Sequence, residues 1–418
     1  MAQLLQTAFP AEFVPFAPED ENTRLKAALR DDPDTRKLDL SIRFYQDDNA
    51  EKWELPAVKM AEEILQRGNL PIHQYLPIAG LPEFTGAAAR LVLGEDSSAV
   101  VERRVASLQT ISATGALHLG ALFLSKFYRC SSRRSVLVPD PSWSNHHKIF
   151  ANVGLCTETY PYFSAENTKG LDFDGIVRSL ETSARGSIIV LHACGHNPTG
   201  WDPSRKEWEK MGEIIRKRQH LPVFDCTYQG LASGSLSQDA WAIRHFVDQG
   251  LEVFIAQSFA KTCGLYGHRI GCLHVVTAGP NAQDTARRVS SQLAILQRCE
   301  ISSPPSYGAF IVSLILTVGK LFSEWEANLR IMSGRIMAMR SSLRSKLEAM
   351  ETPGDWTSIT DQKGMYCFLS FSDAQLLRLR EEFHVYLASN GRISMAGLNR
   401  GNVDYFARAV DQVVREGR

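Results

Sequence analysis

A lysine that follows an apolar run is the residue of this chain whose type and position could carry covalent chemistry. The segment 254–261 reads FIAQSFAK and ends at Lys261. Its apolar part predicts a buried strand. Because burial disfavours an ammonium ion, we expect the pKa of Lys261 to fall below its usual value of about 10.4. A neutral lysine amine is a nucleophile that can form a Schiff base with an aldehyde cofactor. The segment alone fits a strand followed by a solvated lysine equally well.

Two neighbourhoods have the residue types that hold phosphate. Ser258 precedes Lys261 by three residues and Arg269 follows it by eight, so a hydroxyl and a guanidinium flank the lysine. The second neighbourhood is Ser112, Ala113 and Thr114, which stand before an apolar helical pattern over 117–128. Hydroxyl side chains at a helix start cap free backbone N–H groups, and the same groups attract phosphate. For this second neighbourhood taken alone, an ordinary helix cap is the simpler interpretation.

Other apolar runs also end on functional side chains. Runs over 135–139, 187–192 and 221–225 are followed or ended by Trp143, Asn197 and Asp225. Strands that alternate with helical patterns predict an α/β fold with a mainly parallel sheet. Ligands of such sheets bind at the carboxyl ends of the strands, so we expect these three side chains to meet Lys261 there.

The composition excludes several classes of protein. The chain has 418 residues, enough for a large domain and a smaller one, and its 46 basic and 46 acidic residues balance. This balance argues against nucleic-acid and membrane-surface proteins. No apolar run approaches the roughly 18 residues of a membrane span, and the N-terminus lacks the pattern of a secretory signal.

The cysteines and histidines give no sign of a metal site. The eight cysteines include no CxxC pair, so we expect reduced, mostly buried thiols in a cytoplasmic protein. His192, Cys194 and His196 alternate, but this spacing is not a common zinc pattern. We therefore expect no metal.

Four motifs in order resemble one enzyme family. They lie at 73–78 (HQYLPI), 192–200 (HACGHNPTG), 225–230 (DCTYQG) and 257–261 (QSFAK). The chain resembles the class I aspartate aminotransferases, pyridoxal-phosphate (PLP) enzymes of fold type I, and among them the animal cytosolic subgroup. The similarity extends from about Phe13 to the C-terminus.

The resemblance implies a fold and a division of the chain. A large domain would hold a mainly parallel sheet between helices, and a smaller α/β domain would form from both chain ends. The expected bounds are an N-terminal arm over 1–22, a small domain over 23–52 and 330–418, and a large PLP-binding domain over 53–329. A long helical pattern over 321–349 would bridge the two domains.

The resemblance also implies how the cofactor is held. Lys261 looks like the Schiff-base lysine that moves the substrate proton, and Asp225 like the carboxylate that keeps the ring nitrogen protonated. The implied partners of the ring are His146 behind Asp225, Asn197 and Tyr228 at its 3′ oxygen, and Trp143 stacked on its face. The implied phosphate ligands are Ser112, Ala113, Thr114, Ser258 and Arg269. Tyr75 matches a phosphate contact from a neighbouring subunit, which implies a homodimer.

Two arginines match the groups that select the substrate. Arg392 corresponds to the clamp on the α-carboxylate, and Arg298 to a clamp from the other subunit on the distal carboxylate. A planar guanidinium suits bidentate carboxylate binding better than lysine does. The implied reaction converts L-aspartate and 2-oxoglutarate to oxaloacetate and L-glutamate.

The chain departs from the family pattern at the substrate end. Ser41 and Arg43 stand where the family has glycines, and Ile301 and Ser303 replace residues beside the distal pocket. Arg43 could block the site, compete for a substrate carboxylate, or swing out to solvent. Two alternatives therefore stay open: a PLP enzyme with a shifted reaction, such as an aspartate racemase or decarboxylase, and a PLP-binding protein whose activity has decayed.

Overall fold

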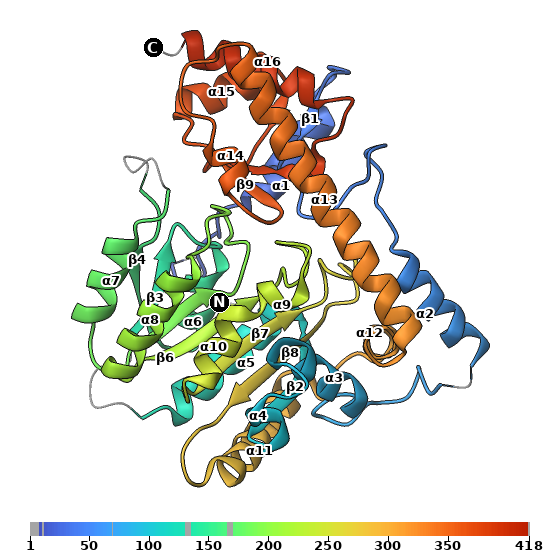
Figure 1. Ribbon diagram of the computed structural model, residues 1–418, viewed down its shortest axis with the longest axis vertical. Helices are drawn as coiled ribbons and strands as arrows, with labels where there is room; N and C mark the ends of the chain where they lie inside the picture. Colours follow the sequence, from blue (N-terminus) through green and yellow to red (C-terminus); the bar gives the residue numbers. More distant parts are fainter. Residues whose placement is uncertain (1–7, 11, 69, 130–134, 165–169, 417–418) are drawn as a thin grey trace, which may run out of the picture.

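The computed structural model describes residues 8–10, 12–68, 70–129, 135–164 and 170–416. Part of the predicted arm (1–7 and 11) and Cys130 lie outside these ranges. A large sheet flanked by helices forms one part of the molecule, and a group of helices and short strands forms a smaller part beside it (Figure 1). The long helix α13 (Gly319–Ala349) runs from one part to the other.

A seven-stranded mixed sheet positions the site. Its strands are β2 (Val105–Ile111), β3 (Ser135–Asp140), β4 (Cys156–Pro161), β5 (Ile188–His192), β6 (Leu221–Cys226), β7 (Val253–Ser258) and β8 (Ile270–Val276). Their order is β2-β8-β7-β6-β5-β3-β4. Only β8 is antiparallel to its neighbours, so the other six strands point the same way and end at one edge. The predicted mainly parallel sheet is confirmed.

Helices cover both faces of this sheet. One face carries α5 (Ser112–Phe127), α6 (Asn145–Asn152) and α11 (Ala282–Ile301), and the other carries α7 (Phe173–Thr182), α8 (Arg205–Arg218) and α10 (Trp241–Asp248). Along β5, Ile189 and Leu191 pack into the second layer while Ile188 and Val190 pack into the first. A strand buried on both faces must be apolar at every position, which explains the unbroken apolar runs.

The smaller part joins segments from both ends of the chain. Its elements are α1 (Glu21–Asp31), β1 (Leu38–Asp39), α14 (Ser358–Asp361), β9 (Tyr366–Phe368), α15 (Asp373–Glu381), β10 (Val385–Tyr386), β11 (Arg392–Ser394), the 3-10 turn η1 (Met395–Gly397) and α16 (Val403–Glu416). β1 pairs parallel with β10, and Leu38 lies opposite Val385. β1 is only two residues long, and 40–45 continues without regular structure. The exact domain bounds stay a prediction.

Helix α13 links the two parts through a continuous apolar stripe. Its buried side chains recur every three or four residues, as in Trp325, Leu329 and Met332. The Trp325 Nε1 donates a hydrogen bond of 2.8 Å to the carbonyl of Thr262, the residue after Lys261. The helix thereby fixes the backbone beside the lysine.

The remaining helices pack around this link or join the sheet strands. They are α2 (Pro56–Arg67), α3 (Pro82–Leu93), α4 (Ser98–Val101), α9 (Leu236–Asp239) and α12 (Tyr307–Thr317). Among the described residues, no single helix is long and apolar enough to cross a membrane; α12 and α13 meet that test only as a pair bent by 96°.

Candidate active site

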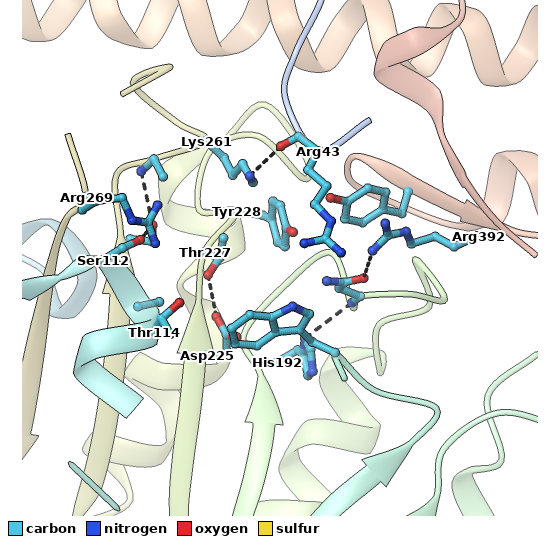
Figure 2. Close-up of a pocket in the computed structure, with 16 residues that line it drawn as sticks. Arg43, Ser112, Thr114, His192, Asp225, Thr227, Tyr228, Lys261, Arg269 and Arg392 are labelled. Carbon is cyan, nitrogen blue, oxygen red and sulfur yellow. Dashed lines mark hydrogen bonds between the residues drawn. The ribbon is translucent and has the colours of Figure 1, made fainter. Parts of the chain in front are cut away.

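A cavity of about 250 Å³ lies at the carboxyl ends of the strands (Figure 2). Trp143, Asn197, Asp225 and Lys261 all line it, each at or shortly after the end of a parallel strand. The full lining is Arg43, Ser112, Ala113, Thr114, Trp143, His192, Asn197, Asp225, Thr227, Tyr228, Ser258, Ala260, Lys261, Arg269, Tyr366 and Arg392. Most side chains singled out in the sequence therefore meet in one place.

Lys261 has an environment that favours its neutral amine. Its Nζ donates a 2.6 Å hydrogen bond to the backbone carbonyl of Arg43 and lies 4.8 Å from the Tyr266 ring centroid. Burial lowers the pKa of Lys261 to about 7, with further lowering from the charges of Arg43, Arg269 and Arg392. A large fraction of the lysine is then an uncharged nucleophile near neutral pH.

Asp225 stays a charged carboxylate although it is buried. Burial alone would raise its pKa, but the hydrogen bond and electrostatic interaction with His146, together with His192 and Thr227, hold the pKa below its usual value. The two Asp225 oxygens are bonded to His146 Nε2 (3.1 Å) and Thr227 Oγ1 (2.6 Å). His146 is fully buried behind the cavity, and its Nδ1 is 2.8 Å from the Ser142 Oγ. Asp225 thus presents a fixed negative charge to the cavity.

The ends of β2 and β7 form a cradle for an anion. Ser112 and Ser258 lie with their hydroxyl oxygens 2.9 Å apart, and the Ser112 N–H donates to the Arg269 carbonyl. Ser112 and Arg269 have positive φ values of 59° and 51°, a costly conformation for residues other than glycine. Ser112, Ala113 and Thr114 form the first turn of α5, whose free N–H groups favour an anion.

This cradle corrects one expectation. The helical pattern was expected from residue 117, but α5 already begins at Ser112. The residue before it, Ile111, gives no side-chain cap, so the interpretation of these hydroxyl residues as an ordinary cap is wrong.

Arg392 is held in place at the other end of the cavity. Its Nη1 donates to the Asn197 Oδ1 at 3.2 Å, and its guanidinium carbon lies 4.2 Å from the ring centroid of Tyr366. The Nε of Arg392 is buried and has no hydrogen-bond partner among the described residues. Burial raises the pKa of the nearby Tyr228, so its phenol remains a proton donor.

Four lining residues were not assigned roles from the sequence: Thr227, His192, Ala260 and Tyr366. Thr227 belongs to the same motif as Asp225 and could have been found there. His192 was considered only as a metal ligand, and burial keeps it neutral by lowering its pKa. Tyr366 comes from the short strand β9, far along the chain, and no pattern in the sequence indicated it.

Two expected site residues lie outside the cavity of a single chain. Tyr75 is 93% exposed on a loop. Arg298 is exposed near the end of α11, where its Nη1 donates to the Ser302 Oγ at 3.1 Å.

The cysteines and histidines form no metal centre in the part of the chain that the structure describes. No group of three or more His, Cys, Asp or Glu side chains is arranged to hold a metal ion there. All seven cysteines in the described ranges are free thiols, and Cys194, Cys226, Cys263, Cys272 and Cys367 are buried.

Comparison with known proteins identifies the family. The model of the family "Aminotransferase class I and II" matches residues 35–410. The chain belongs to this family. This aminotransferase is 44% identical over 400 residues to the cytoplasmic aspartate aminotransferase of Schizosaccharomyces pombe, with 96% of this chain and 97% of the relative covered.

Solved structures agree with this assignment. The aspartate aminotransferase from Saccharomyces cerevisiae cytoplasm matches with a TM-score of 0.94 at 42% identity, covering 99% of this chain and all of the other. An aromatic-amino-acid aminotransferase from Burkholderia pseudomallei, covalently bound to pyridoxal phosphate, matches with a TM-score of 0.92 at 37% identity, covering 97% and 99%. The expected fold type is confirmed, and the family includes enzymes named for different amino acids.

Proposed function

We propose that this aminotransferase uses PLP to exchange amino groups between L-aspartate and 2-oxoglutarate, giving oxaloacetate and L-glutamate. The observation that carries the proposal is the pairing of Lys261, a lysine with a pKa of about 7, with the charged Asp225 in one cavity. The names of the full-length relatives support aspartate as the amino acid.

The residues present fit PLP. The cradle of Ser112, Ala113, Thr114, Ser258 and Arg269 suits a phosphate. Asp225 would hold a protonated ring nitrogen, Tyr228 and Asn197 would bond the 3′ oxygen, and Trp143 would pack on the ring. When bound, PLP supplies an acceptor for the electrons released at the substrate Cα.

The chain's own groups would then handle the proton and the charges. The Lys261 Nζ, about half neutral near pH 7, would accept the proton released from the substrate Cα and later return a proton. His146 acts through Asp225, which it keeps ionised in the buried site. Lys261 and Asp225 are catalytic in this proposal, and His146 is a positioning residue.

Substrate binding would require two copies of the chain. Arg392 would hold the α-carboxylate, while Arg298 from a second copy would hold the distal carboxylate and Tyr75 from that copy would contact the phosphate. Their exposure in one chain supports a homodimer with shared sites. The names of the relatives support a cytoplasmic location.

A weakened enzyme is the second candidate, because the Arg43 side chain lines the cavity at a position where the family resemblance implies glycine. A racemase or decarboxylase has less support, since the full-length relatives are named aspartate aminotransferases.

One experiment separates these candidates. The PLP-loaded protein is followed by its visible absorbance while L-aspartate is added, and the products are analysed for oxaloacetate and for D-aspartate. We expect the visible band to fade and oxaloacetate to form, and we expect neither in Lys261→Ala. A visible band that does not change when aspartate is added would favour the weakened enzyme, and formation of D-aspartate would favour the racemase. A wild-type protein with no visible band would reject Lys261 as the cofactor's attachment point.

A further inference from the structure

Arg43 is an exposed residue whose unpaired guanidinium lines the cavity. Figure 2 shows its side chain extending into the cavity on the side of Tyr228 and Arg392. Its backbone carbonyl is fixed by the hydrogen bond from Lys261, which anchors the irregular segment 40–45 at this point. Among the described residues, nothing forms a hydrogen bond or ion pair with the Arg43 guanidinium.

The charges that line the cavity do not balance. Three arginine side chains, Arg43, Arg269 and Arg392, and Lys261 when it is protonated, face one acidic side chain, Asp225. Asp225 is already held by His146 and Thr227 and forms no ion pair with any of the arginines. Unpaired cations gathered in a partly buried cavity favour anionic ligands. A phosphate on Arg269 and one carboxylate on Arg392 would still leave the Arg43 guanidinium without an anion.

Arg43 and Arg392 differ in their freedom to meet a ligand. The Arg392 guanidinium is fixed by Asn197 and by the Tyr366 ring. The Arg43 guanidinium is restrained by no polar partner, so it can turn toward a second carboxylate. Arg298, the residue expected to bind that carboxylate, is exposed outside the cavity of its own chain.

We propose that Arg43 is a specificity-determining residue that binds the second carboxylate of a dicarboxylic amino acid directly, from the same chain as Lys261. This inference rests on the proposed function and refines its substrate contacts. One chain would then supply a guanidinium for each carboxylate, and dicarboxylate binding would depend less on Arg298.

Calorimetric titration of the PLP-loaded protein with succinate and with propionate tests the inference. Arg43→Gln removes the charge but keeps most of the side chain, and Arg43→Gly opens the space. We expect both variants to bind succinate about 10-fold or more weakly and propionate about equally well, because propionate lacks the second carboxylate. Arg330→Gln removes an exposed cation of α13 and should leave both affinities unchanged.

The competing roles of Arg43 give different results. Tighter succinate binding in Arg43→Gly would mean that the side chain blocks the site, and unchanged binding in both variants would mean that it swings out to solvent; either result overturns the inference. Equal visible absorbance of the variants checks that the cavity is intact, and Arg43→Lys, which keeps a charge, should restore part of the affinity.

The inference and the proposed function can fail separately. If the variants lose succinate binding while the wild type transfers no amino group from aspartate, the inference holds and the proposed function fails. If the wild type transaminates aspartate and the variants bind succinate as it does, only the inference fails. A wild type that binds no succinate overturns the inference.

Discussion

Lys261 and Asp225 face the same cavity, but the proposed chemistry needs Lys261 uncharged and Asp225 negatively charged. Burial favours the uncharged form of each group, and for Lys261 three neighbouring guanidinium groups act in the same direction. For Asp225 the buried His146 opposes burial and keeps the carboxylate ionised. A nucleophilic amine and a fixed negative charge therefore coexist at the same pH.

The lowered pKa predicts how fast the cofactor-free protein captures PLP. Below pH 7 Lys261 is mainly an ammonium ion, which cannot attack an aldehyde, and above pH 7 it is mainly an amine. The capture rate, followed by visible absorbance, should rise with pH around a midpoint near 7. Arg43→Gln should move the midpoint upward because it removes one of the charges that lower the pKa. A wild-type midpoint near that of a free lysine would contradict this account.

The charge of Asp225 should matter more than the hydroxyl beside it. Asp225→Asn keeps the shape but removes the negative charge, and we expect kcat/KM for aspartate to fall by about 100-fold or more. Thr227→Val removes only the hydrogen bond of its hydroxyl, and a fall of about 10-fold or less is expected. Steady-state kinetics measures both variants, and equal losses would show that the charge is not the decisive property.

The sequence identified residues at the ends of recognisable strands, because strand direction places them at one edge. Lys261, Asp225 and Asn197 were found in this way. Tyr366 was not, because it reaches the cavity from a three-residue strand that a hydrophobic pattern cannot reveal. The orientation of Arg43 also required the structure, since segment 40–45 has no regular secondary structure.

Strand β8 sets the spacing between β2 and β7, the two strands whose ends form the anion cradle. It lies between β2 and β7, and Gly271 pairs with both Thr110 and Ser258. A Cβ at Gly271 would lie 2.5 Å from the Gln257 carbonyl oxygen and 2.7 Å from the Ser112 backbone carbon. Glycine is required here because two backbones approach so closely.

Gly271→Ala should therefore weaken PLP binding. The added methyl group must push β2 away from β7, which separates Ser112 from Ser258, and we expect an affinity loss of about 10-fold or more. Gly267→Ala is the matched control, because nothing lies within 4 Å of a Cβ added there. Equilibrium titration with PLP compares the two variants. Similar affinities would show that the cradle tolerates a wider strand spacing.

Element prediction failed where the pattern was weak or the partner distant. The segment of β2 mixes polar and apolar residues and acquires its strand conformation from pairing with β8. The start of α5 was misplaced because its first turn consists of small and hydroxyl residues that resemble a cap.

In the proposed homodimer, two exposed side chains would connect each chain to the site of the other copy. Tyr75 and Arg298 belong to the proposed site but do not line the cavity of their own chain. The sequence indicated this arrangement only through family resemblance, since no local pattern tells which copy a side chain serves.

Mixing two impaired variants should raise aspartate turnover above that of either variant alone if the sites are shared. The Lys261→Ala variant lacks the nucleophile. The double variant Arg298→Gln, Tyr75→Phe lacks the two side chains that each chain would contribute to the site of the other copy. Random reassembly after mild denaturation gives mixed dimers with one intact site, so about a quarter of all sites should be complete. Turnover of aspartate is measured for each variant alone and for the mixture. No gain on mixing would reject the shared site.

The position of β2 has a consequence for how the chain is made. Among the described strands, β2 is an edge strand that pairs only with β8, and β8 is completed about 165 residues later. At typical rates of synthesis, β2 would wait roughly 10 to 30 s for its partner. During that interval its backbone groups and apolar side chains stay available to other chains. The nascent polypeptide should therefore depend on chaperones most strongly between the emergence of these two strands from the ribosome.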